Sequence, residues 1–289
     1  MKLKQLFIVI SIVSAQISLA QTMHETSSLA TKLVGEYKYT EAIGLYQRIL
    51  FFSESDSITY FTSLKLAELF EKQANFLGAA QYYHIAAGSG YEEESMMLSH
   101  RLKAALYLLK EKRGNEVVQV LDTSSMESEQ KDSLYYKRML FLGLAFVLEQ
   151  NRSLAISYFQ LFYPLLSKAD SIKLSALNNQ LREVNYRNAK ASLIASLILP
   201  GSGQLLNGDY KNGINSMLVN GTMIGLSIWT GVSYNWINGV LVAALLAPRY
   251  YVGGANMAAD AANKRNVKSF DKLFDKYVSF FKEVRLTTL

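Results

Sequence analysis

The side chains best suited to acid–base or metal chemistry in this sequence are three histidines, His24, His84 and His100. No two of them lie one helical turn apart, so the sequence has no HExxH zinc motif, and it has no G-x-S-x-G nucleophile motif either. The chain contains no cysteine, which excludes thiol catalysis, disulfides and cysteine-based zinc sites. We therefore expect a protein that is not an enzyme and that holds no metal or cofactor.

Glycine-rich segments raise the question of phosphate binding. The segment Gly208–Gly213 has the glycine spacing of a phosphate-binding loop, but Ile214 and Asn215 follow it where such a loop needs Lys and Ser or Thr. The GSG sequences at Gly88–Gly90 and Gly201–Gly203 lack the strand-turn-helix setting of a dinucleotide site. The net charge is +6, but the basic residues are spread along the chain. We expect neither a nucleotide nor a nucleic acid as a ligand.

The segment Met1–Ala20 has the pattern of a secretory signal peptide. Two lysines precede an apolar run that begins at Leu6, and Ser18 and Ala20 supply the small residues of a cleavage site. An uncleaved anchor helix is the alternative. In either case we expect an exported protein of a bacterial envelope.

A repeat occupies the first half of the chain. Four anchor residues, Ala42, Ala79, Val117 and Ala155, follow one another at nearly equal intervals. Each has a larger apolar residue four positions later, on the same helical face. These larger residues are Tyr46, Tyr83, Leu121 and Phe159. Because apolar residues also recur before each anchor, we expect two helices per repeat, with small residues where the helices cross.

The segment KYTEAIGLYQRIL (Lys38–Leu50) resembles the second helix of the tetratricopeptide repeat (TPR), and the resemblance extends over Leu29–Leu166. The interval between the anchors exceeds the usual repeat length of about 34 residues, so we expect the extra residues in loops between the units. The aromatic residue that usually begins the first helix is missing: Ser63, Arg101 and Met139 occupy that position.

The resemblance implies a concave face, formed by the first helices, that binds a peptide or protein. The positions that it carries to this face are Leu64, Glu68, Leu102, Leu106, Leu109, Leu140, Leu144 and Val147. A groove lined by so many leucines is either a partner site or a surface covered by the C-terminal part of the same chain. We favour the second interpretation, because exposed apolar patches of that size are rare.

A long uncharged segment, Asn212–Pro248, lies in the second half of the chain. Since about 20 residues of helix cross a bilayer, we expect one crossing at Gly213–Val232 and a second at Trp236–Gly254. A third crossing or a re-entrant segment at Ala191–Gly208 is left open. Trp229, Tyr234 and Trp236 flank the turn between them, as aromatic residues do at a membrane interface. The alternative is a buried helical hairpin of a soluble domain.

A glycine-rich corner precedes this segment. Its characteristic residues are Pro200, Gly201, Gly203, Gln204, Gly208, Tyr210 and Gly213. We expect Pro200 to end a helix, Gly201 and Gly203 to permit positive backbone angles or close packing, and Gln204 to bond backbone groups freed by the break. The pattern resembles a module of uncharacterised bacterial envelope proteins that precedes hydrophobic helices and often follows TPR units.

The C-terminal tail has the pattern of an amphipathic helix. Its apolar stripe consists of Val267, Phe270, Leu273, Phe274, Tyr277, Val278 and Phe281. The stripe lies either in a membrane interface or against the repeat domain. We favour packing on protein, because the opposite face mixes Asp with Lys and so attracts anionic lipid weakly.

These features predict an all-α protein: a TPR-like helix-pair solenoid, a hydrophobic helical hairpin and a C-terminal amphipathic helix. The predicted divisions are a signal peptide (1–20), a TPR-like repeat domain of four units (21–185), a hydrophobic membrane-associated module (186–265) and the amphipathic helix (266–289). The predicted function is a non-enzymatic, membrane-anchored scaffold for protein–protein interactions, with its repeat domain in the periplasm and with protein and membrane lipid as partners. The alternative is a membrane-embedded helper of transport or envelope protein assembly, with the TPR-like part as its docking platform.

Overall fold

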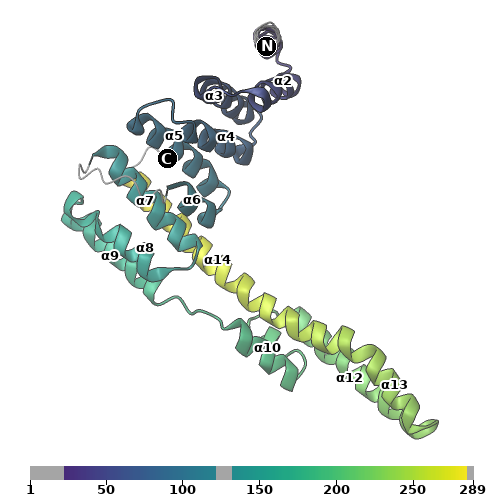
Figure 1. Ribbon diagram of the computed structural model, residues 1–289. Coiled ribbons are helices and arrows are strands. Elements are labelled where there is room, and N and C mark those ends of the chain that lie inside the picture. The colour runs from purple at the N-terminus through teal and green to yellow at the C-terminus, as the bar shows by residue number, and fades with distance from the viewer. Residues whose placement is uncertain (1–22, 122–131, 285–289) are drawn as a thin grey trace, which may run out of the picture. The chain divides into compact units, whose positions relative to one another are not determined.

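The computed structural model describes residues 23–121 and 132–284, and every regular element in these two ranges is a helix (Figure 1). The prediction of an all-α protein is therefore confirmed. The chain divides into two compact units, of which the first runs to Leu166 and the second is Ser167–Glu283. The predicted signal peptide (1–20) lies outside the described residues.

The first unit is a series of helices in which neighbours along the chain pack against one another. Residues 23–35 are helical, and Thr31 Oγ1 lies 3.1 Å from the Tyr46 hydroxyl, which joins this helix to the next. The helices that follow are α2 (Tyr39–Phe52), α3 (Asp56–Lys72), α4 (Phe76–Gly88), α5 (Glu94–Lys110), α6 (Gly114–Leu121), α7 (Ser133–Leu148) and α8 (Arg152–Gln160), with a 3-10 turn at Tyr163–Leu165.

The same turn recurs four times in this unit. Each copy contains one non-glycine residue with a positive φ of 53° to 60°. These residues are Tyr37, Ala74, Lys112 and Gln150. In each copy the next backbone N–H donates to the carbonyl five residues earlier at 2.9 Å, the longer bond of a Schellman helix end. The turn therefore fixes the angle between the two helices it joins without needing a glycine.

The four predicted anchor residues lie in the core of this unit. Ala42, Ala79, Val117 and Ala155 have no exposed surface, and the larger residues four positions after them are at most 2% exposed. A small residue also stands opposite Phe159, because a Cβ added to Gly143 would lie 2.7 Å from the phenylalanine ring. The anchor residues are thus buried, and Gly143 lies in close contact with Phe159.

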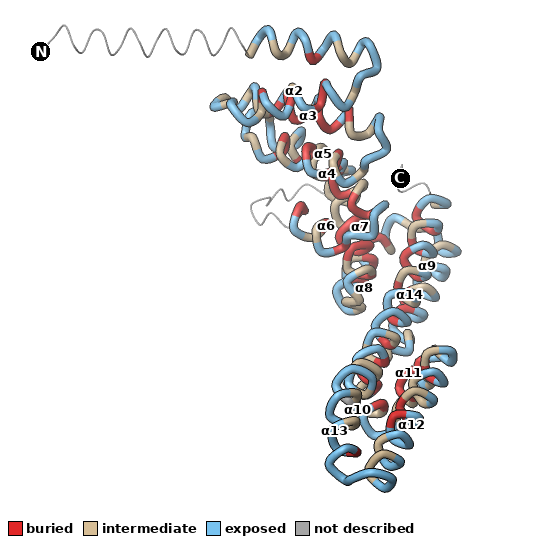
Figure 2. Tube along the Cα trace, turned by 90° about the vertical axis from the view of Figure 1, so that its right-hand side faces the viewer, coloured by how far each residue is buried: buried red, intermediate tan, exposed pale blue. Residues whose placement is uncertain are grey.

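The second unit is built around its last helix. Its helices are α9 (Lys168–Arg182), α10 (Ala189–Ile198), α11 (Ser202–Leu206), α12 (Tyr210–Ser233), α13 (Trp236–Ala247) and α14 (Gly253–Glu283), with a π-helical turn at Pro248–Val252. Helix α14 packs against α9, α10 and α11 and buries five of the seven predicted stripe residues (Figure 2). Val267 is exposed and Val278 half-buried. The Tyr277 hydroxyl donates to Asn178 Oδ1 of α9 at 2.8 Å inside the protein.

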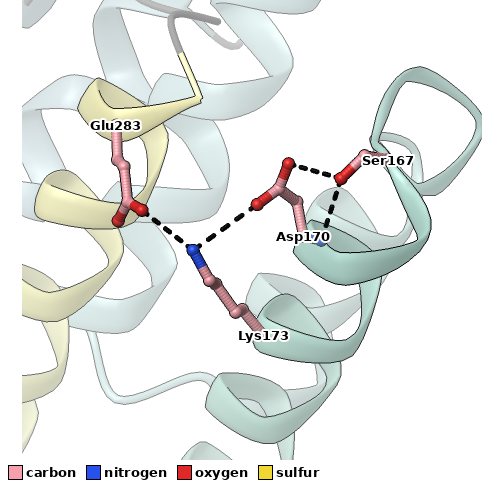
Figure 3. Close-up of polar contacts among 4 residues, drawn as sticks. All are labelled: Ser167, Asp170, Lys173 and Glu283. Carbon is pink, nitrogen blue, oxygen red and sulfur yellow. Dashed lines mark hydrogen bonds and ion pairs between the residues drawn. The ribbon is translucent and has the colours of Figure 1, made fainter.

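Polar contacts at the protein surface cap α9 and join it to α14 (Figure 3). Ser167 caps α9, since its Oγ accepts from the backbone N–H of Asp170 at 3.1 Å and donates to the Asp170 carboxylate at 2.6 Å. Lys173 Nζ lies 3.6 Å from Asp170 and 2.8 Å from Glu283 of α14. Because these groups are largely open to solvent, their contacts supply little stability.

No helix in the described ranges is both long enough and apolar enough to span a bilayer. The predictions of transmembrane helices at Gly213–Val232 and Trp236–Gly254, and of a membrane-anchored localisation in the envelope, are therefore wrong. Asparagines, serines and glycines dilute the hydropathy of α12, and α13 ends at Ala247 after 12 residues. The length of the uncharged segment Asn212–Pro248 was therefore a poor guide to the apolar length of α12 and α13.

Candidate protein-binding face

Four exposed lysines of α3 and α5 lie over aromatic rings of the preceding helices. Lys65 Nζ is 5.7 Å from the ring centre of Tyr46 and Lys72 Nζ is 5.5 Å from that of Tyr39. The corresponding pairs one repeat later are Lys103 over Tyr83 at 4.7 Å and Lys110 over Phe76 at 5.1 Å. We call these four pairs the lysine–aromatic row.

The repeat itself creates this row. The two lysines of each helix are two helical turns apart, so both project from the same side. The rings of α4 follow those of α2 at the interval that separates Ala79 from Ala42. The lysines of α5 follow those of α3 at the interval that separates Val117 from Ala79. The pairs lie where the second helix of one unit meets the first helix of the next, at α2 with α3 and at α4 with α5, so equivalent side chains meet at both junctions.

A stack of rings supports the α5 half of the row. Phe76 and Tyr107 are 5.5 Å apart with an interplanar angle of 8°, and Tyr107 and Tyr83 are 6.2 Å apart at 15°. His100 continues the stack beyond Tyr83 at 6.0 Å and 13°. The lysine ammonium groups of α5 thus rest on a rigid aromatic surface, an arrangement in which each cation is attracted to the ring face beneath it.

Hydrogen bonds hold the polar groups of the stack in place. The Tyr107 hydroxyl donates to Glu71 Oε1 of α3 at 2.7 Å, and Lys103 Nζ donates to the Tyr83 hydroxyl at 3.1 Å. Burial, followed by the nearby Glu71 carboxylate, raises the pKa of both Tyr83 and Tyr107. Burial, followed by the Lys103 charge, lowers the pKa of His100.

These pKa shifts decide what the face can do near neutral pH. The tyrosines stay protonated and the imidazole stays uncharged, so the hydroxyls do not act as bases or nucleophiles there. The described residues also contain no group of three or more His, Cys, Asp or Glu side chains that could hold a metal ion. What the face does offer is a set of fixed cations beside aromatic surface, which is suited to binding an anion.

The predicted groove residues occupy different environments. Leu102, Leu109, Leu140, Leu144 and Val147 are at most 3% exposed, so in this structure their side chains lie inside the protein. Leu64 and Leu106 are half-buried, and Glu68 is exposed on α3. The last three lie on the two helices that carry the lysines.

The glycine-rich corner is a close junction of helices in the second unit. Gly201 and Gly208 have φ of +90° and +78°. Gly203 is buried, and a Cβ there would lie 2.0 Å from the Ser192 carbonyl oxygen. Gly213 is also buried, Pro200 is half-buried and Tyr210 is exposed.

Two buried amides complete this junction. Gln204 Nε2 donates to the Gly254 carbonyl at 2.7 Å, while its Oε1 accepts from Ser196 Oγ at 2.8 Å. Asn207 Nδ2 lies 2.9 Å from Ser192 Oγ, 2.8 Å from the Gly203 carbonyl and 3.3 Å from the Ala258 carbonyl. Gln204 thus bonds a backbone carbonyl of α14 rather than a backbone group freed by the break at Pro200. The corner joins α10, α11 and α14, and its amides are occupied by that packing.

Sequence reasoning missed the lysine–aromatic row, although its signal is present: the four lysines have the period of the apolar anchors. A comparison of apolar residues alone between repeats overlooks this coincidence.

No protein-family model matches the chain, and no curated protein or solved structure is similar to it.

Proposed function

We propose that this chain is a TPR-like scaffold that binds an acidic segment of a protein partner along the lysine–aromatic row. The main observation behind this proposal is that the row repeats together with the helix pairs. Its lysines and its rings each recur at an interval that also separates two anchors. The four equivalent turns support the helix-pair solenoid, and the TPR resemblance supports a role in protein binding. A periodic row of cations suits an extended ligand better than a small molecule.

Charge and solvation favour an acidic partner. Each ammonium group rests against a ring on one side and faces solvent on the other, so it loses little hydration when a carboxylate approaches. Glu71 is engaged by Tyr107, and Glu68 is exposed on α3. Glu71 therefore lies beside the α5 half of the row, where the Tyr107 hydroxyl engages its carboxylate. The net charge of +6 would further speed encounter with an acidic segment.

The experiment measures binding of fluorescent peptides to the full chain by anisotropy. The probes are an extended Glu-rich peptide with interspersed aromatic residues and a matched peptide with Gln in place of Glu. We expect only the acidic peptide to bind, with an affinity that falls as salt rises. Lys103→Glu with Lys110→Glu should weaken binding at least tenfold.

The matched control changes the same charge elsewhere. Lys268→Glu with Lys272→Glu alters two exposed lysines of α14 and should change binding by much less. Equal losses in the two double variants would show that net charge alone drives binding, and this would contradict a specific face. In-cell photocrosslinking from position 106, between the α5 lysines, then identifies the natural partner.

A further inference from the structure

One side of α12 carries an apolar stripe that faces away from the rest of the second unit. Asn220 and Met223 lie on the buried side of the helix. The stripe consists of Ile214, Leu218, Gly221, Gly225, Ile228 and Val232, all of them exposed. Leu218, Ile228 and Val232 are 65%, 61% and 84% exposed. The spacing of four and three residues in alternation is that of a helix that packs along a second helix.

The exposed apolar area on α12 and α13 is too large for an ordinary monomer surface. Thirteen large apolar side chains between positions 214 and 245 are each at least 42% exposed. Together they present on the order of 1,000 Å² of apolar surface, above the roughly 300–600 Å² of the largest patch on a typical monomer. Four of the thirteen, Ile214, Leu218, Ile228 and Val232, belong to the stripe.

The centre of the stripe is unoccupied within the chain. A Cβ added to Gly221 or Gly225 would meet nothing within 4 Å, whereas a Cβ at Gly201, Gly203 or Gly239 would clash. Glycine is disfavoured in a helix interior. Close contacts inside the chain explain the glycines at 201, 203 and 239, but not those at 221 and 225. At Gly221 and Gly225 the missing side chains leave a notch where another backbone can approach closely.

A second copy of this chain fits the stripe best. The helix has no charged residue after Lys211, so a charged partner finds no complementary group along the stripe. The stripe also has the same pattern from both ends: two large residues, two glycines, two large residues, with the same spacing in either direction. A two-fold axis through the stripe, midway between Gly221 and Gly225, would therefore place each Gly221 opposite a Gly225 of the other copy, which is the self-complementarity of a symmetric dimer. We infer that two copies associate by packing their α12 stripes together.

Because the chain has no cysteine, introduced cysteines report this contact directly. The full chain with Gly221→Cys and Gly225→Cys should form a covalent dimer on mild oxidation, because notched helices bring their Cα atoms within disulfide range. The control carries Asn215→Cys and Thr222→Cys, two exposed positions of α12 off the stripe, and should remain largely uncrosslinked. Equal crosslinking of the two variants would mean random collision and would overturn the proposal.

Light scattering during gel filtration gives an independent measurement on the unmodified chain. We expect a dimer that Leu218→Lys with Ile228→Lys converts to monomer, at least a tenfold loss of association. Ile172→Lys, which changes an equally exposed residue of α9, should leave the dimer intact. A chain that is monomeric at all concentrations, or that binds phosphatidylglycerol-containing vesicles as a monomer, would overturn the proposal.

Discussion

The Tyr60 hydroxyl and Nε2 of His100 lie 3.0 Å apart, a hydrogen bond that joins α3 to α5. The imidazole also stacks on Tyr83 of α4, so three helices meet at this histidine. Its charge state is therefore coupled to the packing of the first unit.

Stability should fall as this histidine becomes charged. Burial and Lys103 lower the pKa of His100, and Glu92 opposes them in part. The unfolded chain thus binds the proton more readily, and the contribution is fully present above the ordinary histidine pKa of about 6.5. It is lost as pH falls from there through the lower folded-state pKa.

The matching measurement is a series of thermal melts between pH 4 and pH 8. His100→Gln should reduce the loss of Tm on acidification. Part of that loss should remain in the variant, because burial also lowers the pKa of His84. Tyr60→Phe should lower Tm at pH 7 but keep the acid dependence. Identical acid dependence in the wild type and His100→Gln would contradict this assignment.

Ala79 offers a test of the helix crossing, since it has no exposed surface on α4. Ala79→Trp should overpack the crossing and cost about 1–3 kcal/mol or more in the free energy of unfolding. Gln81→Trp changes an exposed residue of the same helix and should cost far less. Urea titration compares the two, and equal midpoints would rule out the crossing at Ala79.

Gln150 holds a φ of 60°, a conformation in which glycine has no steric penalty. Gln150→Gly should remove a steric cost of about 1 kcal/mol from the folded first unit. The net gain in the free energy of unfolding is smaller, because glycine also increases the entropy of the unfolded chain. Glu149→Gly, one residue earlier at a φ of −76°, should destabilise it. Calorimetry of both variants gives the comparison, and a loss of stability in each would argue against the left-handed turn.

Gly203 is the position where the second unit tolerates a side chain least. A Cβ there would lie 2.0 Å from the Ser192 carbonyl oxygen and 2.8 Å from the Ala258 Cβ, so the backbone of α10 would have to shift. We expect Gly203→Ala to cost about 1–3 kcal/mol. Gly253→Ala has open space around it and should be nearly neutral. Chemical denaturation of the two variants should show this difference, and equal effects would refute the close junction.

Much of the first unit could be predicted because its pattern is local. Ala42 and Ala79 revealed the helix period, and they lie in the core as expected. The left-handed residues could not be predicted, since Tyr37 and Gln150 are not residue types that signal positive φ. Nor did the pattern distinguish Leu102 as a core residue from a groove residue, because both faces of α5 are rich in leucine.

The second unit was harder to predict because its determinants are distant in sequence. Asn207 bonds to the carbonyl of Ala258, and the Asn266 amide bonds to the backbone of Arg187 in both directions. A sequence window shows such asparagines only as polar interruptions. The uncharged segment Asn212–Pro248 resembles membrane helices in sequence. Its own asparagines and the short α13 nevertheless leave no described helix that can cross a bilayer.

The dependence of the corner on α14 has a consequence for the order in which the protein is made. The first unit consists of contacts between helices that are close together in the sequence, so it can fold while synthesis continues. The amides of Gln204 and Asn207 find their partners at Gly254 and Ala258 only after the last helix has been translated. Until then α10 to α13 carry uncovered apolar residues, and both amides lack their bonds to α14. A nascent chain that stalls before α14 would thus be a folded domain followed by an aggregation-prone tail, and loss of the C-terminus would disable the entire second unit.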